Sequence, residues 1–229
     1  MDIYFVRHGH PDYKNDCLTP LGQLQAKACA ERLSGEGITE IYSSTCGRAL
    51  ETAAYTAEAL GITVTKLDFM REIRWGSRDG EPIEFGGLPW HVVNAMVARG
   101  ESVTRSDWAE IPPFDRNIAV EYVQKVQDNF DAWMESLGYR REGDYYRVLT
   151  DDVDRKVALF SHGGSSTVAM GRLLNMTFPQ AIATFHHDFT SVCRLMLNGE
   201  KGEMTCPKIE YLNDYRHILG LDDGNALCN

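Results

Sequence analysis

The chain has 229 residues, of which 43% are hydrophobic and 24% charged, and its formal net charge is −10. These proportions are typical of a globular protein with a sizeable buried core, and they exclude extensive disorder. The negative charge argues against nucleic acid or an anionic membrane as a partner, because such partners bind basic surfaces. The negative net charge does not exclude a small phosphorylated ligand, since a few local cations can make the potential of a cleft positive.

The cysteines and the first residues of the chain indicate the cellular compartment of the protein. None of the six cysteines forms a Cys-x-x-Cys pair, which argues against a zinc knuckle or a dithiol redox centre. Residues 2–6 start an apolar strand directly, without the basic and apolar regions of a secretory signal, and no stretch reaches the roughly 18 apolar residues of a membrane span. We expect a cytoplasmic protein with free thiols and a single domain over 1–229. The oligomeric state stays open, with a homodimer as one alternative.

The first third of the chain alternates short strands with helices. Residues 2–7 are predicted to form a buried strand, and residues 19–34 a helix with Thr19 as its N-cap. Strands are predicted at 40–43 and 62–67, with a second helix between them. Alternation of this kind predicts an α/β fold, a three-layer sandwich with a mostly parallel central sheet and helices on both faces.

Between about residues 70 and 115 the alternation stops, and this stretch holds four of the eight prolines. Its aromatic residues favour an ordered cap inserted into the domain over a linker. The aromatic side chains either line a substrate site or fill the core of the cap; they are Trp75, Phe85, Trp90 and Trp108. The arginines of the region either face solvent or bind a second anionic group; they are Arg74, Arg78, Arg99 and Arg105.

Regular elements resume in the second half of the chain. Residues 116–137 have the apolar face of a helix, and residues 138–155 are polar and predict a surface excursion. The most apolar strand of this half is 156–160, and a helix follows it. Strands at 190–197 and 204–212 complete the predicted sheet.

Two predicted strands end in nearly the same residues. His8 and Gly9 follow the first strand, and His162 and Gly163 follow the strand at 156–160. Parallel strands align their carboxyl ends at one edge of the sheet, where ligands bind in open α/β folds. We therefore expect the two imidazoles to face one another, with glycines that allow close approach of the backbone to a ligand.

Arginines and a helix N-terminus add positive charge to this edge. Arg7 precedes the first histidine, and Arg48 lies near the start of the second helix. Arginine matches the geometry of phosphate oxygens, and the helix after His162 offers unpaired N–H groups. Together these groups indicate a pocket for a phosphoryl group.

Four motifs follow one another along the chain in a recognisable order. They are Arg7-His8-Gly9, then Leu18-Thr19-Pro20-Leu21-Gly22, then Ile41-Tyr42-Ser43-Ser44-Thr45 leading to Arg48, and finally Ser161-His162-Gly163. In this order they resemble the histidine phosphatase superfamily, which has the phosphoglycerate-mutase-like fold. The resemblance covers most of residues 1–76 and 156–198.

The resemblance implies a role for each matching residue. His8 attacks phosphorus and becomes phosphohistidine, while Arg7, Arg48 and His162 hold the phosphoryl oxygens, with Gly163 at the same phosphate site. Imidazole attacks only in its neutral form, and flanking arginines favour that form by repelling an added proton. The covalent intermediate divides one difficult step into two easier ones.

The leaving alkoxide needs a proton, and a carboxyl group with a raised pKa can supply it. The segment Arg71-Glu72-Ile73-x-x-Gly76 resembles the family's acid segment, which implies that Glu72 is the proton donor. The sequence departs from the family at residues 77–80, so Asp79 or Glu81 is the alternative donor. His10 is a second departure, since the family often has Glu or Gln after the first motif.

These observations predict a phosphomonoesterase that hydrolyses a small phosphorylated substrate without a metal or any other cofactor. A mutase-like phosphotransferase is one alternative, although residues 72–76 match the mutase branch only in part. A non-catalytic module that binds a phosphorylated ligand is another. A histidine metal site is a third, formed from members of the set His8, His10, His162, His186 and His187.

Overall fold

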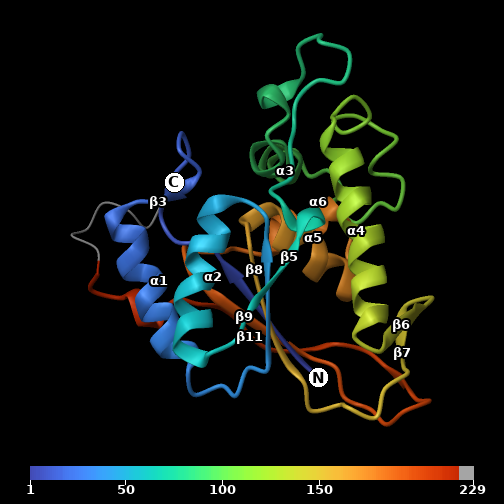
Figure 1. Ribbon diagram of the computed structural model, residues 1–229. Coiled ribbons are helices and arrows are strands. Elements are labelled where there is room, and N and C mark those ends of the chain that lie inside the picture. Colours follow the sequence, from blue (N-terminus) through green and yellow to red (C-terminus); the bar gives the residue numbers. More distant parts are fainter. Residues whose placement is uncertain (222–229) are drawn as a thin grey trace.

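The computed structural model describes residues 1–221, and its centre is a six-stranded sheet in the order β11-β9-β1-β8-β4-β5 (Figure 1). The strands are β1 (Asp2–Arg7), β4 (Glu40–Ser44), β5 (Val64–Leu67), β8 (Lys156–Ser161), β9 (Val192–Met196) and β11 (Lys208–Asp214). The four neighbours β1, β8, β4 and β5 are parallel, whereas β9 runs antiparallel to both β1 and β11. The predicted, mostly parallel sheet is confirmed.

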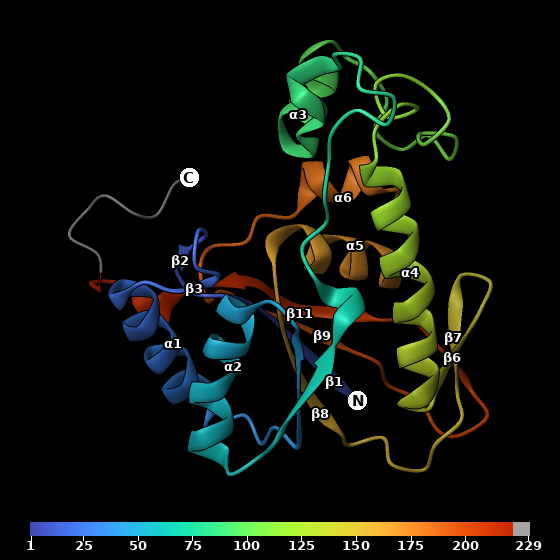
Figure 2. The same ribbon diagram turned by 45° about the horizontal axis from the view of Figure 1, so that its top comes forward.

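Helices cover both faces of this sheet (Figure 2). On one face lie α1 (Pro20–Leu33) and α2 (Gly47–Leu60); on the other lie α4 (Ala119–Ser136), α5 (Gly163–Leu173) and α6 (Phe178–Thr184). Alternate residues of β1 serve the two cores, with Tyr4 and Val6 in the cluster under α1 and α2, and Ile3 and Phe5 in the cluster under α4 and α5. Burial of each such side chain contributes roughly 1.5–3 kcal/mol. The three-layer arrangement is therefore as predicted.

Helix α1 begins where its sequence predicts. The Thr19 hydroxyl accepts a hydrogen bond from the Gly22 amide at 3.1 Å, and Pro20 occupies the first turn, where its missing N–H costs nothing. Before α1, a short hairpin of β2 (Pro11–Asp12) and β3 (Cys17–Leu18) closes the turn that follows β1.

The cap stands over the carboxyl edge of the sheet, between η1 (Asp68–Met70) and α4 (Figures 1 and 2). It contains η2 (Glu84–Gly87) and α3 (Pro89–Ala98), which match the predicted insertion. Helix α4 begins three residues later than expected because the Asn117 side chain accepts hydrogen bonds from Ala119 N at 3.0 Å and Gly76 N at 3.3 Å. Asn117 thus ties the two ends of the cap together.

The prediction of a polar surface excursion at 138–155 is wrong. Strands β6 (Tyr139–Glu142) and β7 (Tyr145–Val148) form a hairpin there, and β10 (Met204–Thr205) joins it in a three-stranded sheet. Tyr139, Tyr146 and Val148 are fully buried, and the charged residues between them conceal the alternation.

The strand expected at 204–212 is divided between two sheets. Its first residues form β10 of the small sheet, and β11 of the central sheet begins at Lys208. Pro207 stands at the break, because proline has no N–H to donate to a neighbouring strand.

Two observations concern the compartment. Within residues 1–221 no helix is long and apolar enough to cross a bilayer. The cysteines of this part of the chain, Cys17, Cys29, Cys46, Cys193 and Cys206, are free thiols, and Cys228 lies outside the described residues. The cytoplasmic location stays a prediction, as does the single domain over 1–229.

Candidate active site

The two predicted histidines meet at the carboxyl edge of the sheet. Strands β1 and β8 are adjacent and parallel, with Arg7 opposite Ser161 in the register, so the residues that follow them emerge side by side. The ring centroids of His8 and His162 lie 5.2 Å apart, and the side chains are 2% and 0% exposed. Two imidazoles can therefore reach one small ligand.

The Nε2 atom of the His8 ring carries no proton. Its Nδ1 lies 2.7 Å from the carbonyl oxygen of Gly9, which can only accept, so Nδ1 carries the proton of the neutral ring. The Nε2 lone pair then accepts a hydrogen bond from Arg48 Nε at 3.3 Å, at the edge of the pocket. Burial, followed by the charge of Arg7, lowers the pKa of His8 well below its usual value. His8 is therefore neutral at pH 7.

Ser44 orients the His162 ring. Its Nε2 lies 2.9 Å from Ser44 Oγ, and that oxygen already accepts a hydrogen bond from Cys46 N at 3.2 Å. Within residues 1–221 Nε2 is the one acceptor within reach of the Ser44 hydroxyl proton, which assigns the ring proton of His162 to Nδ1. Burial lowers the pKa of His162 well below its usual value, so this ring is also neutral.

The Arg7 guanidinium is fixed from two sides. Its Nη1 donates to the carbonyl oxygen of His187 at 2.5 Å, and the group lies over the Phe189 ring at 4.2 Å from the centroid. Two buried donors, Arg7 Nε and His162 Nδ1, have no acceptor anywhere in residues 1–221. Buried polar groups are normally paired, so an acceptor-rich ligand is the expected partner.

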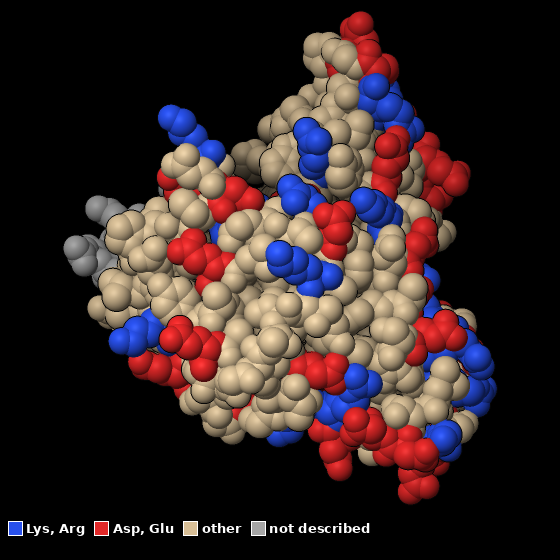
Figure 3. All heavy atoms as spheres, viewed as in Figure 1, with Lys and Arg blue, Asp and Glu red and all other residues tan. Residues whose placement is uncertain are grey.

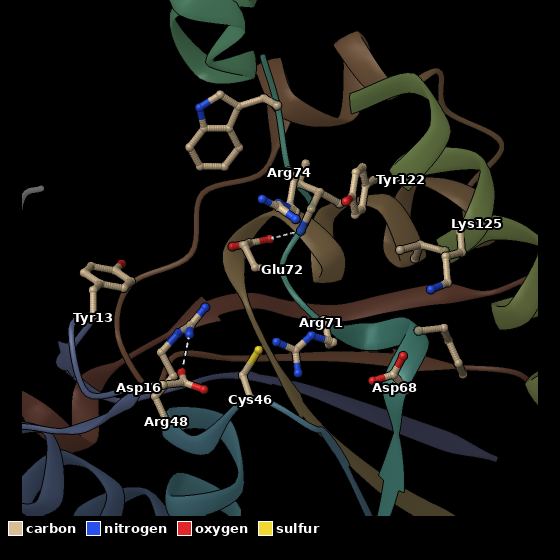
Figure 4. A pocket seen from close by; sticks show the side chains of 14 residues that line it. Tyr13, Asp16, Cys46, Arg48, Asp68, Arg71, Glu72, Arg74, Tyr122 and Lys125 are labelled. Carbon is tan, nitrogen blue, oxygen red and sulfur yellow. Dashed lines mark hydrogen bonds and ion pairs between the residues drawn. The ribbon is translucent and has the colours of Figure 1, made fainter. Parts of the chain in front are cut away.

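Asp16 positions Arg48. One carboxylate oxygen accepts from Arg48 Nη1 at 2.5 Å (Figure 4). The other accepts from Gly47 N at 2.7 Å, so the same carboxylate holds the start of α2. The backbone at residue 47 packs closely against the backbone of Asp16. This requires glycine at 47, because a Cβ there would lie 2.1 Å from the Asp16 carbonyl oxygen.

Glycines also allow the turn of the first motif to pack on α1. A Cβ at Gly9 would lie 2.6 Å from the Gly22 carbonyl oxygen, and one at Gly22 would lie 2.2 Å from that of His10. The Gly9 amide donates to Thr52 Oγ1 of α2 at 3.0 Å. The loop that carries His8 is thereby held between the two helices.

Glu72 lies at the N-terminus of α5. Its Oε1 accepts from Ile73 N at 2.9 Å and Ser165 N at 3.0 Å, and its Oε2 accepts from Gly164 N at 3.2 Å. Burial raises the pKa of Glu72, although these amides and Arg7 oppose the shift. A carboxyl group in this position can hold a proton and release it to a ligand.

The two alternative proton donors lie elsewhere. Asp79 is exposed, and Arg116 binds it through two hydrogen bonds of 2.8 Å, which lowers the pKa of Asp79. Glu81 is exposed as well. Of the three carboxyl groups considered from the sequence, Glu72 is therefore the one placed at the two histidines.

A cavity of about 440 Å³ opens over this edge of the sheet. Its lining includes five of the predicted site residues, which are Arg7, His8, Arg48, Glu72 and Gly163. The sixth, His162, is fully buried beside His8. The structure therefore brings together every residue that the motifs singled out.

Three of the four aromatic residues of the cap that were considered from the sequence take one of the two expected roles, and Phe85 takes neither. Trp75 and Trp90 line the cavity, with ring centroids 5.9 Å apart. Trp108 packs against Phe114 in the core of the cap, at 5.3 Å between centroids, and Phe85 is 53% exposed.

The remaining histidines do not converge on one point. His10 Nδ1 lies 2.9 Å from Thr19 Oγ1, whereas His186 and His187 line the cavity on the side of α6. No three His, Cys, Asp or Glu side chains of residues 1–221 are placed to hold a metal ion together. The histidine metal site considered from the sequence is thus unsupported by the geometry.

Sequence reasoning missed the residues that position the site. Asp16 holds Arg48, Ser44 orients His162, and Phe189 supports Arg7. Ser44 lies within one of the motifs, but nothing in its neighbours indicates a bond to a histidine of another strand. Asp16 and Phe189 stand in irregular segments without any pattern that could have indicated their roles.

The comparison with known families agrees with the motifs. The sequence matches the histidine phosphatase superfamily (branch 1) over residues 3–209, so the chain belongs to this superfamily. Among curated relatives, the probable phosphoglycerate mutase GpmB of Yersinia pestis (strain Pestoides F) is 33% identical over 93 residues. That match covers 37% of this chain and 43% of the relative, so less than half of the relative's length is spanned.

Solved structures share the fold over nearly the whole chain. The mycobacterial glucosyl-3-phosphoglycerate phosphatase has a TM-score of 0.62 at 23% identity and covers 93% of this chain and 98% of its own. The alpha-ribazole phosphatase of Shigella flexneri has a TM-score of 0.61 at 18% identity and covers 94% and 97%. At these identities the likeness concerns the fold.

Close packing of Glu72 on Gly164 leads to a prediction about stability. A Cβ at Gly164 would lie 2.5 Å from Glu72 Oε1 and 2.7 Å from Ile73 Cγ1, whereas one at Gly163 would meet nothing nearer than Arg7 Nε at 3.9 Å. Gly164→Ala should lower the free energy of unfolding by about 1–3 kcal/mol, as overpacking does. Gly163→Ala is the matched control, with a change within about 0.5 kcal/mol. Equal urea-unfolding midpoints for the two variants would contradict the packing.

Proposed function

We propose that the chain is a phosphomonoesterase that hydrolyses a small phosphorylated substrate through a phosphohistidine on His8. The observation that carries this proposal is the buried, neutral His8, which lines the pocket next to two buried donors that have no acceptor within residues 1–221. Those donors, Arg7 Nε and His162 Nδ1, suit the oxygens of a phosphoryl group, as does the Arg48 guanidinium. The fold neighbours named as phosphatases agree with hydrolysis.

In the first step, His8 Nε2 attacks phosphorus in line with the ester oxygen. The P–N bond forms as the P–O bond breaks, and Arg7, Arg48 and His162 stabilise the charge on the phosphoryl oxygens. Glu72 gives its proton to the departing alkoxide, which leaves as the alcohol. The Gly9 carbonyl, by accepting from Nδ1, keeps the ring oriented and stabilises the positive charge that the ring acquires.

In the second step, water takes the place of the alcohol. Glu72, now a carboxylate, removes a proton from the water, whose oxygen attacks phosphorus and breaks the P–N bond. Inorganic phosphate leaves, and both His8 and Glu72 regain their starting protonation states. The same groups thus serve both halves of the reaction.

A phosphotransferase of the mutase type is the second candidate, because the curated relatives are named probable phosphoglycerate mutases. It would use the same first step and then pass the phosphoryl group to an organic acceptor. A phosphoglycerate acceptor distinguishes the two, since hydrolysis releases free phosphate, whereas transfer yields phosphorylated acceptor with little free phosphate. A non-catalytic module would do neither.

His8→Ala tests the proposal directly. In excess EDTA, the wild type should release phosphate from an aryl phosphate, and the variant should lose at least about a thousandfold in kcat/KM, because the nucleophile is absent. Mass analysis after an alkaline quench should find a phosphoryl adduct on His8 of the wild type. Unfolding curves of the two proteins control for misfolding. An inert wild type, or full activity in His8→Ala, would overturn the proposal.

Glu72→Gln tests the proton donor. The loss in kcat should be about a hundredfold larger for an alkyl than for an aryl phosphate, whose leaving group needs little protonation. For the alkyl ester, wild-type activity should fall as pH rises through the raised pKa of Glu72, since the donor then loses its proton, and the variant should lack this decline. The exposed Glu81→Gln is the matched control. Equal losses on both esters would remove Glu72 from this role.

A further inference from the structure

A second, larger cavity adjoins the phosphate pocket. It has a volume of about 760 Å³ and shares Tyr13, Arg48, Glu72 and Trp75 with the smaller one. Its other walls come from the segment after η1 and from α4, and Figure 4 shows their side chains around it. A ligand in the phosphate pocket can therefore extend into this space.

Three cations line the larger cavity without an ionic partner. Neither Arg74 nor Lys125 has a side-chain hydrogen bond or ion pair within residues 1–221, and Arg71 donates to the Thr45 hydroxyl at 3.1 Å without an ion pair. Other arginines of the cap are paired with acidic neighbours, Arg78 with Glu121, Arg99 with Glu84 and Arg105 with Asp107. Of the four cap arginines considered from the sequence, Arg74 is thus the one left for a ligand.

The acidic residues of the cavity do not balance these cations. Asp16 is paired with Arg48, and Glu72 has a raised pKa that favours its neutral form. Asp68 is the remaining carboxylate of the lining and accepts from the Thr45 hydroxyl at 2.9 Å. Arg71, Arg74 and Lys125 therefore face a single carboxylate, in a chain of net charge −10. Figure 3 shows Lys and Arg side chains on this face around η1 and α4, with Asp and Glu side chains between them.

The position of the cavity relates these cations to the leaving group. Glu72 borders both cavities, and under the proposed function it gives its proton to the leaving oxygen, opposite the attacking His8 Nε2. The alcohol portion of the substrate then lies next to Glu72, from which the larger cavity extends to Arg74 and Lys125. Tyr122, one turn before Lys125 on α4, adds a hydroxyl to the same wall.

We propose that the larger cavity binds a second anionic group, a carboxylate or a phosphate, carried by the alcohol portion of the substrate. Arg74 and Lys125 make the contacts, approaching from the cap and from α4, with Arg71 beside them. The preferred substrates are then phosphomonoesters of acidic alcohols rather than of neutral ones. This inference rests on the proposed function, because it uses Glu72 to define the leaving-group side.

Three esters of one three-carbon chain test the inference. 3-Hydroxypropyl phosphate ends in a hydroxyl, 3-(phosphonooxy)propanoate in a carboxylate and propane-1,3-diyl bisphosphate in a second phosphate. The wild type should have a higher kcat/KM for one or both anionic esters than for the hydroxyl ester, and added salt should reduce this preference, since exposed charges are screened. The anionic ester with the larger preference identifies the group that is bound.

Arg74→Gln and Lys125→Gln should each lower the ratio of kcat/KM for the anionic ester to kcat/KM for the hydroxyl ester by about tenfold. This is the effect of losing one charge-assisted hydrogen bond. Arg78→Gln is the matched control, because Arg78 is paired with Glu121 outside the cavity, and its preference should equal that of the wild type. A wild type that hydrolyses all three esters alike, or variants with an unchanged preference, would overturn this inference alone. If the wild type hydrolyses neither the three esters nor the aryl phosphate, the proposed function is overturned instead.

Discussion

The parallel pairing of β1 with β8 is the constraint on which the site depends. It sets Arg7 opposite Ser161, so that the next residue of each strand is a histidine at the same edge of the sheet. A shift of one residue in this register would turn one imidazole to the opposite face. The pairing lies at the centre of the sheet, with both faces covered by helices, and the two buried cores hold it in place.

Burial and positive charge act together on the groups at that edge. Both lower the pKa values of His8 and His162, so two imidazoles stay neutral although arginines surround them. Burial alone has the opposite consequence for Glu72, whose pKa it raises. One desolvated pocket therefore lowers the pKa of two imidazoles and raises the pKa of a carboxyl group, which is the combination that the proposed cleavage of a phosphate ester needs.

The cations of the site fall into two groups with different surroundings. Arg7 and Arg48 are held by a carbonyl oxygen and by Asp16, which limits their movement and suits them to one fixed tetrahedral ligand. Arg74 and Lys125 lie on exposed walls without such partners. Side chains of this second kind can adapt to ligands of different size, which suits a region that selects among substrates.

The sequence by itself determined the layered fold and the residues that gather around His8 and His162, because strand periodicity and repeated strand-end motifs are local signals. It did not reveal the β6–β7 hairpin, whose buried tyrosines alternate with charged residues. Only the tertiary structure showed that Glu72, and neither Asp79 nor Glu81, lies beside the histidines, since this depends on which carboxyl group reaches the N-terminus of α5, 92 and 93 residues further along the chain. The same holds for Asp16 and Ser44: their roles come from contacts between segments that are remote in sequence, and such contacts leave no periodic pattern along the chain.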